Sequence, residues 1–225
     1  MLTPMVLHAE ESPGAILEHA RAVYGALNSY SDTGTVIYEY GPTAHDEQKF
    51  STEFNRNPRH FLLDFRKGSG DRIVITGDPD AFHVWWKATG QVTEFPNPKN
   101  TGAITLNEFP TNAVSTKIPT LLYGNANLPG ALTHFAPERD AGLEPCGEKK
   151  CHRLEGDTSD VYGSTGKNVN IRKLTVWIET ETFLIHKVTE EAPSAPGTLN
   201  RTTTSFIPQA NPTLADDVFK FTPPK

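Results

Sequence analysis

The 225-residue sequence contains only two cysteines, no long apolar run and no strong excess of charge of either sign. No stretch approaches the roughly 20 apolar residues that a membrane-spanning helix needs, so we expect a chain that does not span a membrane. The formal net charge is -6, and acidic and basic residues are mixed along the chain. A surface without a basic field does not attract polyanions, and nucleic acid is therefore not an expected partner.

The sequence also lacks the motifs that mark common catalytic and metal sites. Its eight histidines form no HxH, HExxH or HxxxH set, and two cysteines without further ligands make a poor zinc site. No Gly-x-Ser-x-Gly elbow marks a serine nucleophile. The acidic pairs lie at the edges of expected elements, where solvated charge is ordinary. We expect no catalytic residue, no metal and no cofactor, so binding is favoured over enzymatic activity.

The two cysteines are Cys146 and Cys151, separated by Gly-Glu-Lys-Lys. These four residues have the composition of a hairpin loop, which would bring the cysteines close enough on neighbouring strands for a disulfide. Two inert thiols are the alternative. We favour the disulfide, and such bridges occur mostly in exported proteins.

Residues 1–11 lack the basic region and the long apolar run of a complete signal peptide. We interpret them as a disordered tail, either the end of a signal peptide or a cloning remnant, and residues 12–225 as a single domain. Ser12 and Pro13 mark a helix start, with Ser as N-cap and Pro at the first helical position. Apolar residues then recur at steps of three or four, which predicts an amphipathic helix that packs on the core. These residues are Ile16, Ala20, Val23, Leu27 and Tyr30.

After this helix the apolar period changes to two, which predicts strands separated by short turns and hence an antiparallel meander. The stretch from Ile171 to Val188 reads as a hairpin around the polar residues 179–182. The predicted strands are Thr33–Tyr40, Gln48–Arg56, Arg59–Lys67, Arg72–Thr76, Ala81–Lys87, Gln91–Phe95, Leu143–Cys146, Cys151–Gly156, Asn168–Ile178, Phe183–Glu191, Asn200–Ile207 and a short Val218–Phe221.

About eleven strands form an open sheet only by strong curling or partial closure. Several strands are apolar on both faces, so both faces need a cover. The segment at about 100–123 is rich in apolar residues and predicts two short helices, Thr101–Phe109 and Asn112–Tyr123. It would act as a lid on the open side of the sheet. A packed helical crossover with no cavity beneath it is an equally open interpretation.

Five strings, in this order, resemble the predicted periplasmic proteins related to bacterial lipoprotein carriers. That superfamily includes the LolA and LolB lipoprotein localisation factors and the sensor domain of the RseB regulator, and the resemblance covers nearly the whole chain. The strings are LNSYSDTGT (27–35), FNRNPRHF (54–61), IPTLLYG (118–124), LTVWIETETFLI (174–185) and VFKFTPP (218–224).

The resemblance implies a mainly β fold with helices (α+β), built as a strongly curved, incomplete antiparallel barrel with an N-terminal helix. It implies a helical lid over an apolar cavity for acyl chains, and export to the periplasm. The carriers hold the lid with an arginine, and the sequence does not show which arginine would do so here.

We therefore expect a monomeric periplasmic binding or carrier protein for lipid, acyl chains or lipoprotein. Two alternatives remain: an envelope-stress regulatory or interaction module that senses lipid and binds another envelope protein, and an uncharacterised hydrolase. For every lining residue, plain core packing is the alternative interpretation, and a shift in strand parity would exchange the two faces. The predicted lining residues are Phe54, Phe61, Leu63, Phe65, Ile73, Ile75, Trp85 and Trp177 on the sheet, and Phe109, Ile118, Leu121 and Leu122 on the lid.

Overall fold

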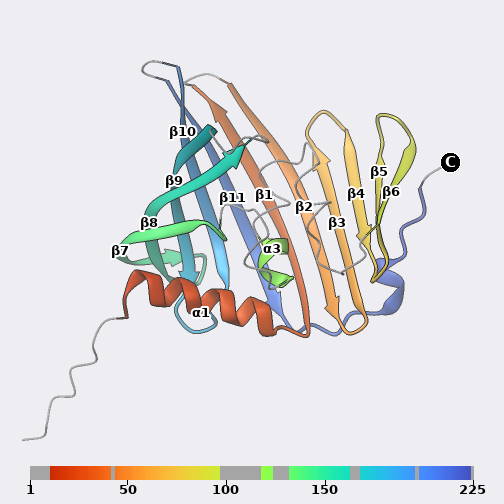
Figure 1. Ribbon diagram of the computed structural model, residues 1–225, viewed down its shortest axis with the longest axis horizontal. Coiled ribbons are helices and arrows are strands. Elements are labelled where there is room, and N and C mark those ends of the chain that lie inside the picture. The colour runs from red at the N-terminus through yellow and green to blue at the C-terminus, as the bar shows by residue number, and fades with distance from the viewer. Residues whose placement is uncertain are drawn as a thin grey trace, which may run out of the picture.

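The computed structural model describes residues 11–41, 44–96, 118–123, 132–162, 168–195 and 198–223. Most of this chain forms one large antiparallel sheet with an N-terminal helix across one end (Figure 1). The elements are α1 (Pro13–Ala26), β1 (Ser29–Tyr40), β2 (Ala44–Arg56), β3 (Arg59–Lys67), β4 (Arg72–Gly77), β5 (Ala81–Trp86), β6 (Gln91–Pro96), α3 (Ile118–Leu122), β7 (Phe135–Cys146), β8 (Lys149–Tyr162), β9 (Asn168–Glu179), β10 (Ile185–Ala195), β11 (Thr198–Ala210) and η1 (Asp216–Phe219).

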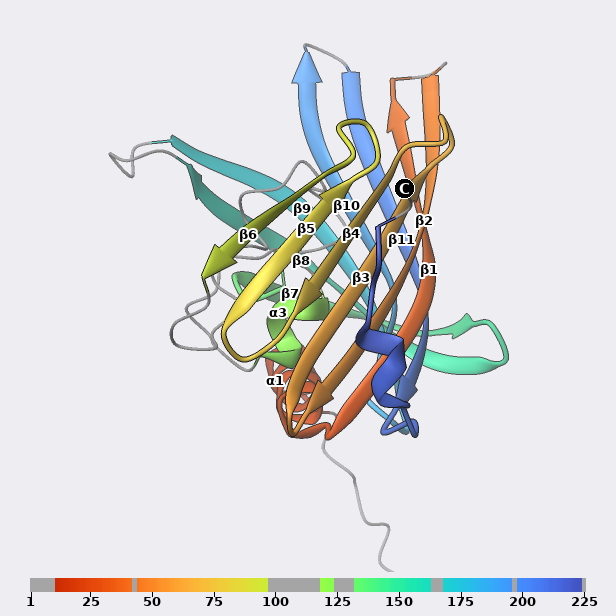
Figure 2. The ribbon, with the colours of Figure 1, turned by 90° about the vertical axis from the view of Figure 1, so that its right-hand side faces the viewer.

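The sheet has eleven strands in the order β6-β5-β4-β3-β2-β1-β11-β10-β9-β8-β7. Two meanders, β1–β6 and β7–β11, meet where β1 pairs with β11, from Tyr30 opposite Ala210 to Tyr40 opposite Asn200. The sheet is strongly curved and does not close, and its two wings bend toward the same side (Figure 2). The predicted incomplete antiparallel barrel of about eleven strands is therefore confirmed.

Helix α1 begins as the sequence predicts. The Ser12 side chain accepts a hydrogen bond from the Ala15 amide at 3.3 Å, and Pro13 occupies the first turn. In the apolar stripe of the helix, Ile16, Leu17, Ala20 and Tyr24 are fully buried, and Val23 is partly buried. The helix ends earlier than the stripe suggested, because Leu27 is the C-cap and Tyr30 already belongs to β1.

The register defines two faces of the sheet. We call the inner face the one that α1 and α3 cover, and the outer face the opposite one. Alternate residues of a strand point to opposite faces, so the register assigns Phe54, Phe61 and Ile75 to the inner face and Asp64 and Val74 to the outer face. The inner face is buried against the helices, which makes it the apolar core of the molecule.

Only part of the predicted lid falls within the described chain. Of the predicted helix Asn112–Tyr123, residues 112–117 lie outside the described chain; helix α3 spans Ile118–Leu122, and all five of its residues are buried. It lies over the middle of the inner face (Figure 1). The predicted helix Thr101–Phe109 lies outside the described residues, and so does the candidate lining residue Phe109.

The predicted last strand, Val218–Phe221, is wrong. Residues 216–219 form the 3-10 helix η1, and the chain around it runs along the outer face. There the ring of Phe219 lies 5.3 Å from that of His60, and the ring of Phe221 lies 5.3 Å from that of Trp85. The spacing of the two phenylalanines is that of a strand in the sequence, but they cover the sheet rather than extend it.

The predicted disulfide joins Cys146 and Cys151, with 5.9 Å between their Cα atoms. The hairpin between β7 and β8 carries it, and Gly147 takes the positive φ of 69° that its turn requires. The predicted hairpin around residues 179–182 is also present, since β9 and β10 pair on either side of it. Bulges in β7 and β10 shift the register locally.

Among the described residues, no helix combines the length and apolar character that crossing a lipid bilayer requires. That same part of the chain holds no group of three or more His, Cys, Asp or Glu side chains placed to bind a metal ion.

Candidate ligand-binding face

The inner face of β2, β3 and β4 is a continuous apolar surface. Six predicted lining residues come together there, each at most 2% exposed. They are Phe54 on β2, Phe61, Leu63 and Phe65 on β3, and Ile73 and Ile75 on β4. Direct register pairs join them across the strands, such as Phe54 with Phe61 and Leu63 with Ile75. Apolar residues at alternate positions of neighbouring strands therefore form one continuous apolar face, as the sequence predicts.

The α3 segment covers this face directly. The Tyr123 ring, one residue after α3, lies 5.8 Å from Phe54, 6.3 Å from Phe61 and 6.1 Å from Phe82. The predicted lid residues Ile118, Leu121 and Leu122 are buried in the same core cluster. In this closed arrangement the apolar face is covered by the protein itself.

Arg56, at the end of β2, fastens both helices to the sheet. Its Nε donates to the Leu27 carbonyl at 2.6 Å, and its Nη2 donates to the carbonyls of Tyr24 at 3.2 Å and Leu122 at 3.0 Å. Its guanidinium also lies 5.2 Å from the centre of the Phe54 ring. Burial, together with the neighbouring Arg59, lowers the pKa of Arg56. One side chain therefore satisfies the carbonyl ends of α1 and α3 at once.

A second arginine makes comparable contacts where the chain enters β7. Arg21 of α1 donates through Nη2 to the carbonyls of Leu132 at 2.6 Å, Thr133 at 3.2 Å and Phe135 at 3.3 Å. Its Nη1 pairs with Glu18 one turn earlier on the helix. Through backbone carbonyls, Arg21 therefore joins α1 to the start of β7, and Arg56 joins α1 and α3 to the end of β2.

Two predicted lining residues lie on the other side of the sheet. The register places Trp85 opposite Val74 and Trp177 opposite Lys187, all on the outer face. Trp177 donates to Glu144 at 2.9 Å, and the Lys187 ammonium lies 3.6 Å from the centre of its ring. Trp85 packs against the C-terminal segment described above. The tryptophans therefore lie apart from the other lining residues.

Toward the β1–β2 and β10–β11 hairpins, the inner face changes from apolar to polar. We call this region the polar tier; its members are Tyr38 and Tyr40 on β1, Asp46 and Gln48 on β2, Arg172 on β9, Glu190 on β10, and Thr202 and Thr204 on β11. Within the tier Arg172 donates to Glu190 at 2.9 Å, and the rings of Tyr38 and Tyr40 stack 6.1 Å apart. Burial raises the pKa of Tyr38. The inner face is thus amphipathic along the strands.

A buried acid lies beneath α1 on the same face. The Tyr30 hydroxyl donates to Asp32 at 2.7 Å, and the Tyr24 hydroxyl accepts from the Ile185 amide at 3.0 Å. Burial raises the pKa of Asp32 to about 6, although hydrogen bonds from Tyr30 and Thr52 act in the opposite direction. Asp32 has no cationic partner among the described residues, and a carboxyl buried in this way carries a cost when it ionises.

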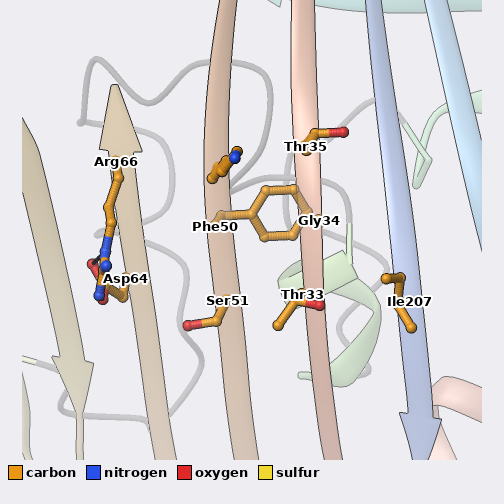
Figure 3. A pocket seen from close by; sticks show the side chains of 9 residues that line it. Thr33, Gly34, Thr35, Phe50, Ser51, Asp64, Arg66 and Ile207 are labelled. Carbon is orange, nitrogen blue, oxygen red and sulfur yellow. Dashed lines mark hydrogen bonds and ion pairs between the residues drawn. The ribbon is translucent and has the colours of Figure 1, made fainter. Parts of the chain in front are cut away.

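The outer face carries a shallow hollow of about 420 Å³ across β11, β1, β2 and β3 (Figure 3). Its walls include the hydroxyls of Thr33, Thr35 and Ser51 and the side chain of Ile207, which is 67% exposed. The hollow lies on the opposite side of the sheet from the apolar inner face. Because it is shallow, an acyl chain in it would stay largely in water.

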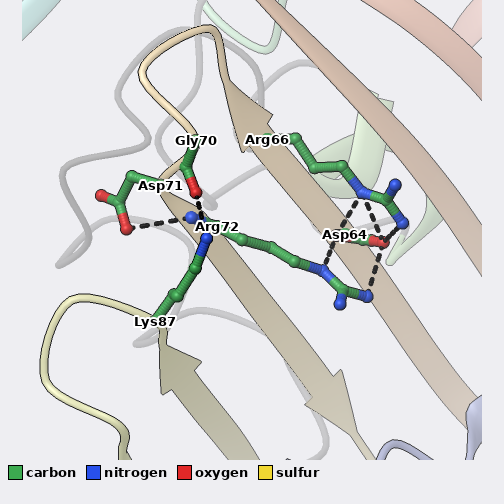
Figure 4. Close-up of polar contacts among 6 residues, drawn as sticks. All are labelled: Asp64, Arg66, Gly70, Asp71, Arg72 and Lys87. Atoms are coloured by element: carbon green, nitrogen blue, oxygen red, sulfur yellow. Dashed lines mark hydrogen bonds and ion pairs between the residues drawn. The ribbon is translucent and has the colours of Figure 1, made fainter. Parts of the chain in front are cut away.

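Asp64 lies at one end of this hollow between two arginines (Figure 4). It accepts from Arg72 at 2.8 and 2.9 Å and from Arg66 at 2.7 Å. Burial by itself would raise the pKa of Asp64, but the two arginines outweigh it and hold that pKa below its usual value. The charges are paired, and this cluster fastens β3 to β4.

Sequence reasoning missed Arg56, Arg21 and Asp32. Arg56 lies inside the string 54–61, yet its partner Leu122 is 66 residues away, so no local pattern marks the contact. Asp32 follows Tyr30 at the spacing of a shared strand face, which was a weak signal for a buried pair.

No protein-family model matches the sequence, and no curated protein sequence matches it. Solved structures do share the fold. An uncharacterised conserved protein from Thermus thermophilus is similar with a TM-score of 0.53 and 12% identity, over 95% of this chain and 95% of that chain. The Mycobacterium tuberculosis lipoprotein LppX has a TM-score of 0.50 and 11% identity, over 91% of this chain and 99% of that chain.

A LolA superfamily protein from Nitrosomonas europaea is also among the similar structures, with a TM-score of 0.41 and 12% identity, over 94% of this chain and 98% of that chain. The structures with TM-scores of 0.50 and 0.53 show a likeness of fold, as the predicted resemblance implies.

Proposed function

We propose that this protein is a periplasmic carrier that binds a lipid, or the acyl chains of a lipoprotein, on the inner face beneath α3. The observation that carries the proposal is the continuous apolar surface of β2–β4, which α3 covers. An acyl chain that takes the place of α3 would meet the same apolar surface.

The free energies support such an exchange. Lifting α3 exposes Ile118, Leu121 and Leu122, which costs roughly 1.5 to 3 kcal/mol for each side chain. Burying an acyl chain stabilises the complex by roughly 0.8 kcal/mol per methylene, so a chain of about 16 carbons supplies about 12 kcal/mol. The chain offsets the loss of the cover without any catalytic group.

In this proposal Arg56 keeps the empty protein closed. Its bonds to Tyr24, Leu27 and Leu122 end on backbone carbonyls, which can exchange protein donors for water when α3 leaves. The Cys146–Cys151 bridge supports an oxidising compartment such as the periplasm. The similarity to the lipoprotein LppX supports the fold that such binding needs.

The first test is native mass spectrometry of the protein purified from cells, followed by extraction of any bound lipid. The second is titration of the delipidated protein with 11-dansylaminoundecanoic acid, whose fluorescence reports an apolar environment. Recovery of no hydrophobic molecule, together with no fluorescence response, would refute the proposal.

A matched pair of variants locates the site. Leu63 and Val74 are both 1% exposed on neighbouring strands, but the register assigns them to opposite faces. Leu63→Ala and Val74→Ala both remove core methyl groups, and only the first changes the proposed site. We expect Leu63→Ala to change the affinity for the dansyl probe at least threefold and Val74→Ala to leave it within twofold. Equal effects would place the probe elsewhere.

A second candidate function is that of an interaction module for another envelope protein, which the hollow on the outer face favours. Ile207 stands beside it, largely exposed, in the middle of the sheet. Substitution of Ile207 by Asp would then abolish capture of an envelope protein and leave the binding of the dansyl probe unchanged. The carrier function alone predicts no loss of capture; it too leaves the binding of the dansyl probe unchanged, since Ile207 lies away from the inner face.

A further inference from the structure

Two buried side-chain oxygen atoms of the polar tier have no hydrogen-bond partner among the described residues. They are Oε1 of Gln48 and Oγ1 of Thr204, on residues that are 7% and 0% exposed. A buried polar atom left without a partner costs free energy, so its presence needs an explanation. Valine would fill the place of Thr204 without that cost, as Val36 and Val188 do beside it.

The register brings the two atoms to one place on the inner face. Gln48 and Thr204 both pair with Val36, one from each side. Their Cα atoms are therefore two strand spacings apart, about 10 Å. From this distance the long side chain of Gln48 and the short one of Thr204 can both reach a small polar group placed over Val36.

The orientation of the Gln48 amide follows from its neighbour. The Gln48 Nε2 donates to the Asp46 carboxylate at 2.7 Å, and a carboxylate only accepts. The amide oxygen must then be the atom without a partner, so it needs a donor. Thr204 can donate or accept through its hydroxyl.

These requirements select the chemistry of the polar group. A hydroxyl both donates and accepts, so it suits both atoms. An ionised carboxylate or phosphate has no proton to give to Gln48, and the cation of the tier, Arg172, is already paired with Glu190. A methyl ester has no donor at all.

We propose that the inner face takes a neutral amphiphile whose polar end carries hydroxyl groups, such as an acylglycerol, with those hydroxyls bound by Gln48 and Thr204. Its acyl chain runs from Val36 toward the apolar face of β2–β4. On the way it passes Phe50 and Phe206, which both pair with Gly34, two residues before Val36 on β1. This inference rests on the proposed function and adds the class of ligand to it.

The test compares three ligands that share one acyl chain: 1-monolauroylglycerol, methyl laurate and laurate. Each displaces the dansyl probe from the delipidated full-length protein. Two additional neutral hydrogen bonds correspond to about tenfold in affinity. We expect monolauroylglycerol to bind about tenfold more tightly than methyl laurate and more tightly than laurate. Equal affinities for the three ligands would overturn the inference and leave the proposed function standing.

Variants assign the preference to the two residues. Thr204→Val keeps the shape of the side chain and is expected to reduce the preference for monolauroylglycerol to about threefold or less, and Gln48→Met provides an independent second variant. Thr203→Val is the matched control, because Thr203 is the next residue on the same strand, and its hydroxyl lies 3.4 Å from that of Thr189 on the outer face. Full preference in both Thr204→Val and Gln48→Met would overturn the inference. If neither the probe nor any of the three ligands binds the wild-type protein, both the proposed function and this inference fail.

Discussion

Arg56 Nη2 lies 3.0 Å from the carbonyl oxygen of Leu122, although the two residues are 66 positions apart in the chain. The same guanidinium holds the C-terminal end of α1. A residue of β2 thereby connects α3, which covers the inner face, to the sheet beneath it.

Replacing Arg56 by Lys should loosen this connection. Lysine keeps the charge but lacks the planar fork that reaches three carbonyls at once, so some of these carbonyls lose their donor. We expect a loss of about 1 to 3 kcal/mol in the free energy of unfolding and faster hydrogen exchange of the α3 amides. Urea denaturation and exchange measured by mass spectrometry would test this. Arg201→Lys is the control, because Arg201 is exposed and pairs with Glu191 across the outer face. Unchanged α3 exchange in Arg56→Lys would show that the arginine does not hold the cover.

Asp32 should make the stability depend on pH in a defined direction. Its pKa is about 6 in the folded protein, above the ordinary 3.8, so between these values the folded state binds more protons than the unfolded state. Stability then falls as the pH rises through this window, by up to about 3 kcal/mol. Glu53, whose burial raises its pKa to about 7, contributes in the same direction.

Asp32→Asn isolates the contribution of the one residue. Asparagine keeps an oxygen that accepts from Tyr30 but has no charge to bury. We expect the variant to be more stable than the wild type at pH 7.5, by up to about 3 kcal/mol, and the advantage to disappear near pH 4. Urea unfolding at intervals between these pH values gives the difference; Glu53 stays in both proteins, and its pKa loses only the smaller contribution from the Asp32 charge in the variant. Asp80→Asn, at an exposed turn position, is the control. An advantage of the same size at every pH would contradict the assignment.

Gly34 permits the close packing of two strands and a ring at the seam of the sheet. A Cβ on this residue would overlap the Phe50 ring and the Ser205 carbonyl oxygen. We expect Gly34→Ala to destabilise the protein by about 3 kcal/mol or more, since the Ser205 oxygen belongs to the backbone of a strand and the buried Phe50 ring packs on Phe206. Gly25→Ala in α1 meets nothing within 4 Å and should stabilise by about 0.5 to 1 kcal/mol. Thermal unfolding of the two variants compares the effects directly, and a tolerated Gly34→Ala would show that the strands adjust.

Local signals predicted most of the elements. Ser12 and Pro13 fixed the start of α1, and strand β3 has the predicted bounds Arg59–Lys67 because turn residues flank an alternating apolar run. The inner-face residues Phe54, Phe61, Leu63 and Phe65 follow from the same alternation. Their role in binding remains a prediction.

Long-range relationships were not available from these patterns. Trp85 and Trp177 read as lining residues because a large apolar side chain does not reveal which face it occupies, and here the register turns both outward. The carbonyl contacts of Arg21 and Arg56 depend on how the chain returns across the sheet. The phenylalanines after residue 217 follow a strand-like spacing, but their rings pack on His60 and Trp85 across the outer face, a contact that the spacing does not reveal.

The pairing of β1 with β11 also constrains how the protein acquires its shape. Each meander forms from neighbours in sequence, but their junction joins residues about 180 positions apart, such as Tyr30 and Ala210. During synthesis, the first six strands therefore wait with β1 unpaired along one side until the last strand has left the ribosome. Pairing between strands so far apart in the sequence slows folding, and the unpaired edge of β1 is prone to aggregation until that pairing forms. A chaperone that shields β1 would shorten the interval in which nascent chains can aggregate.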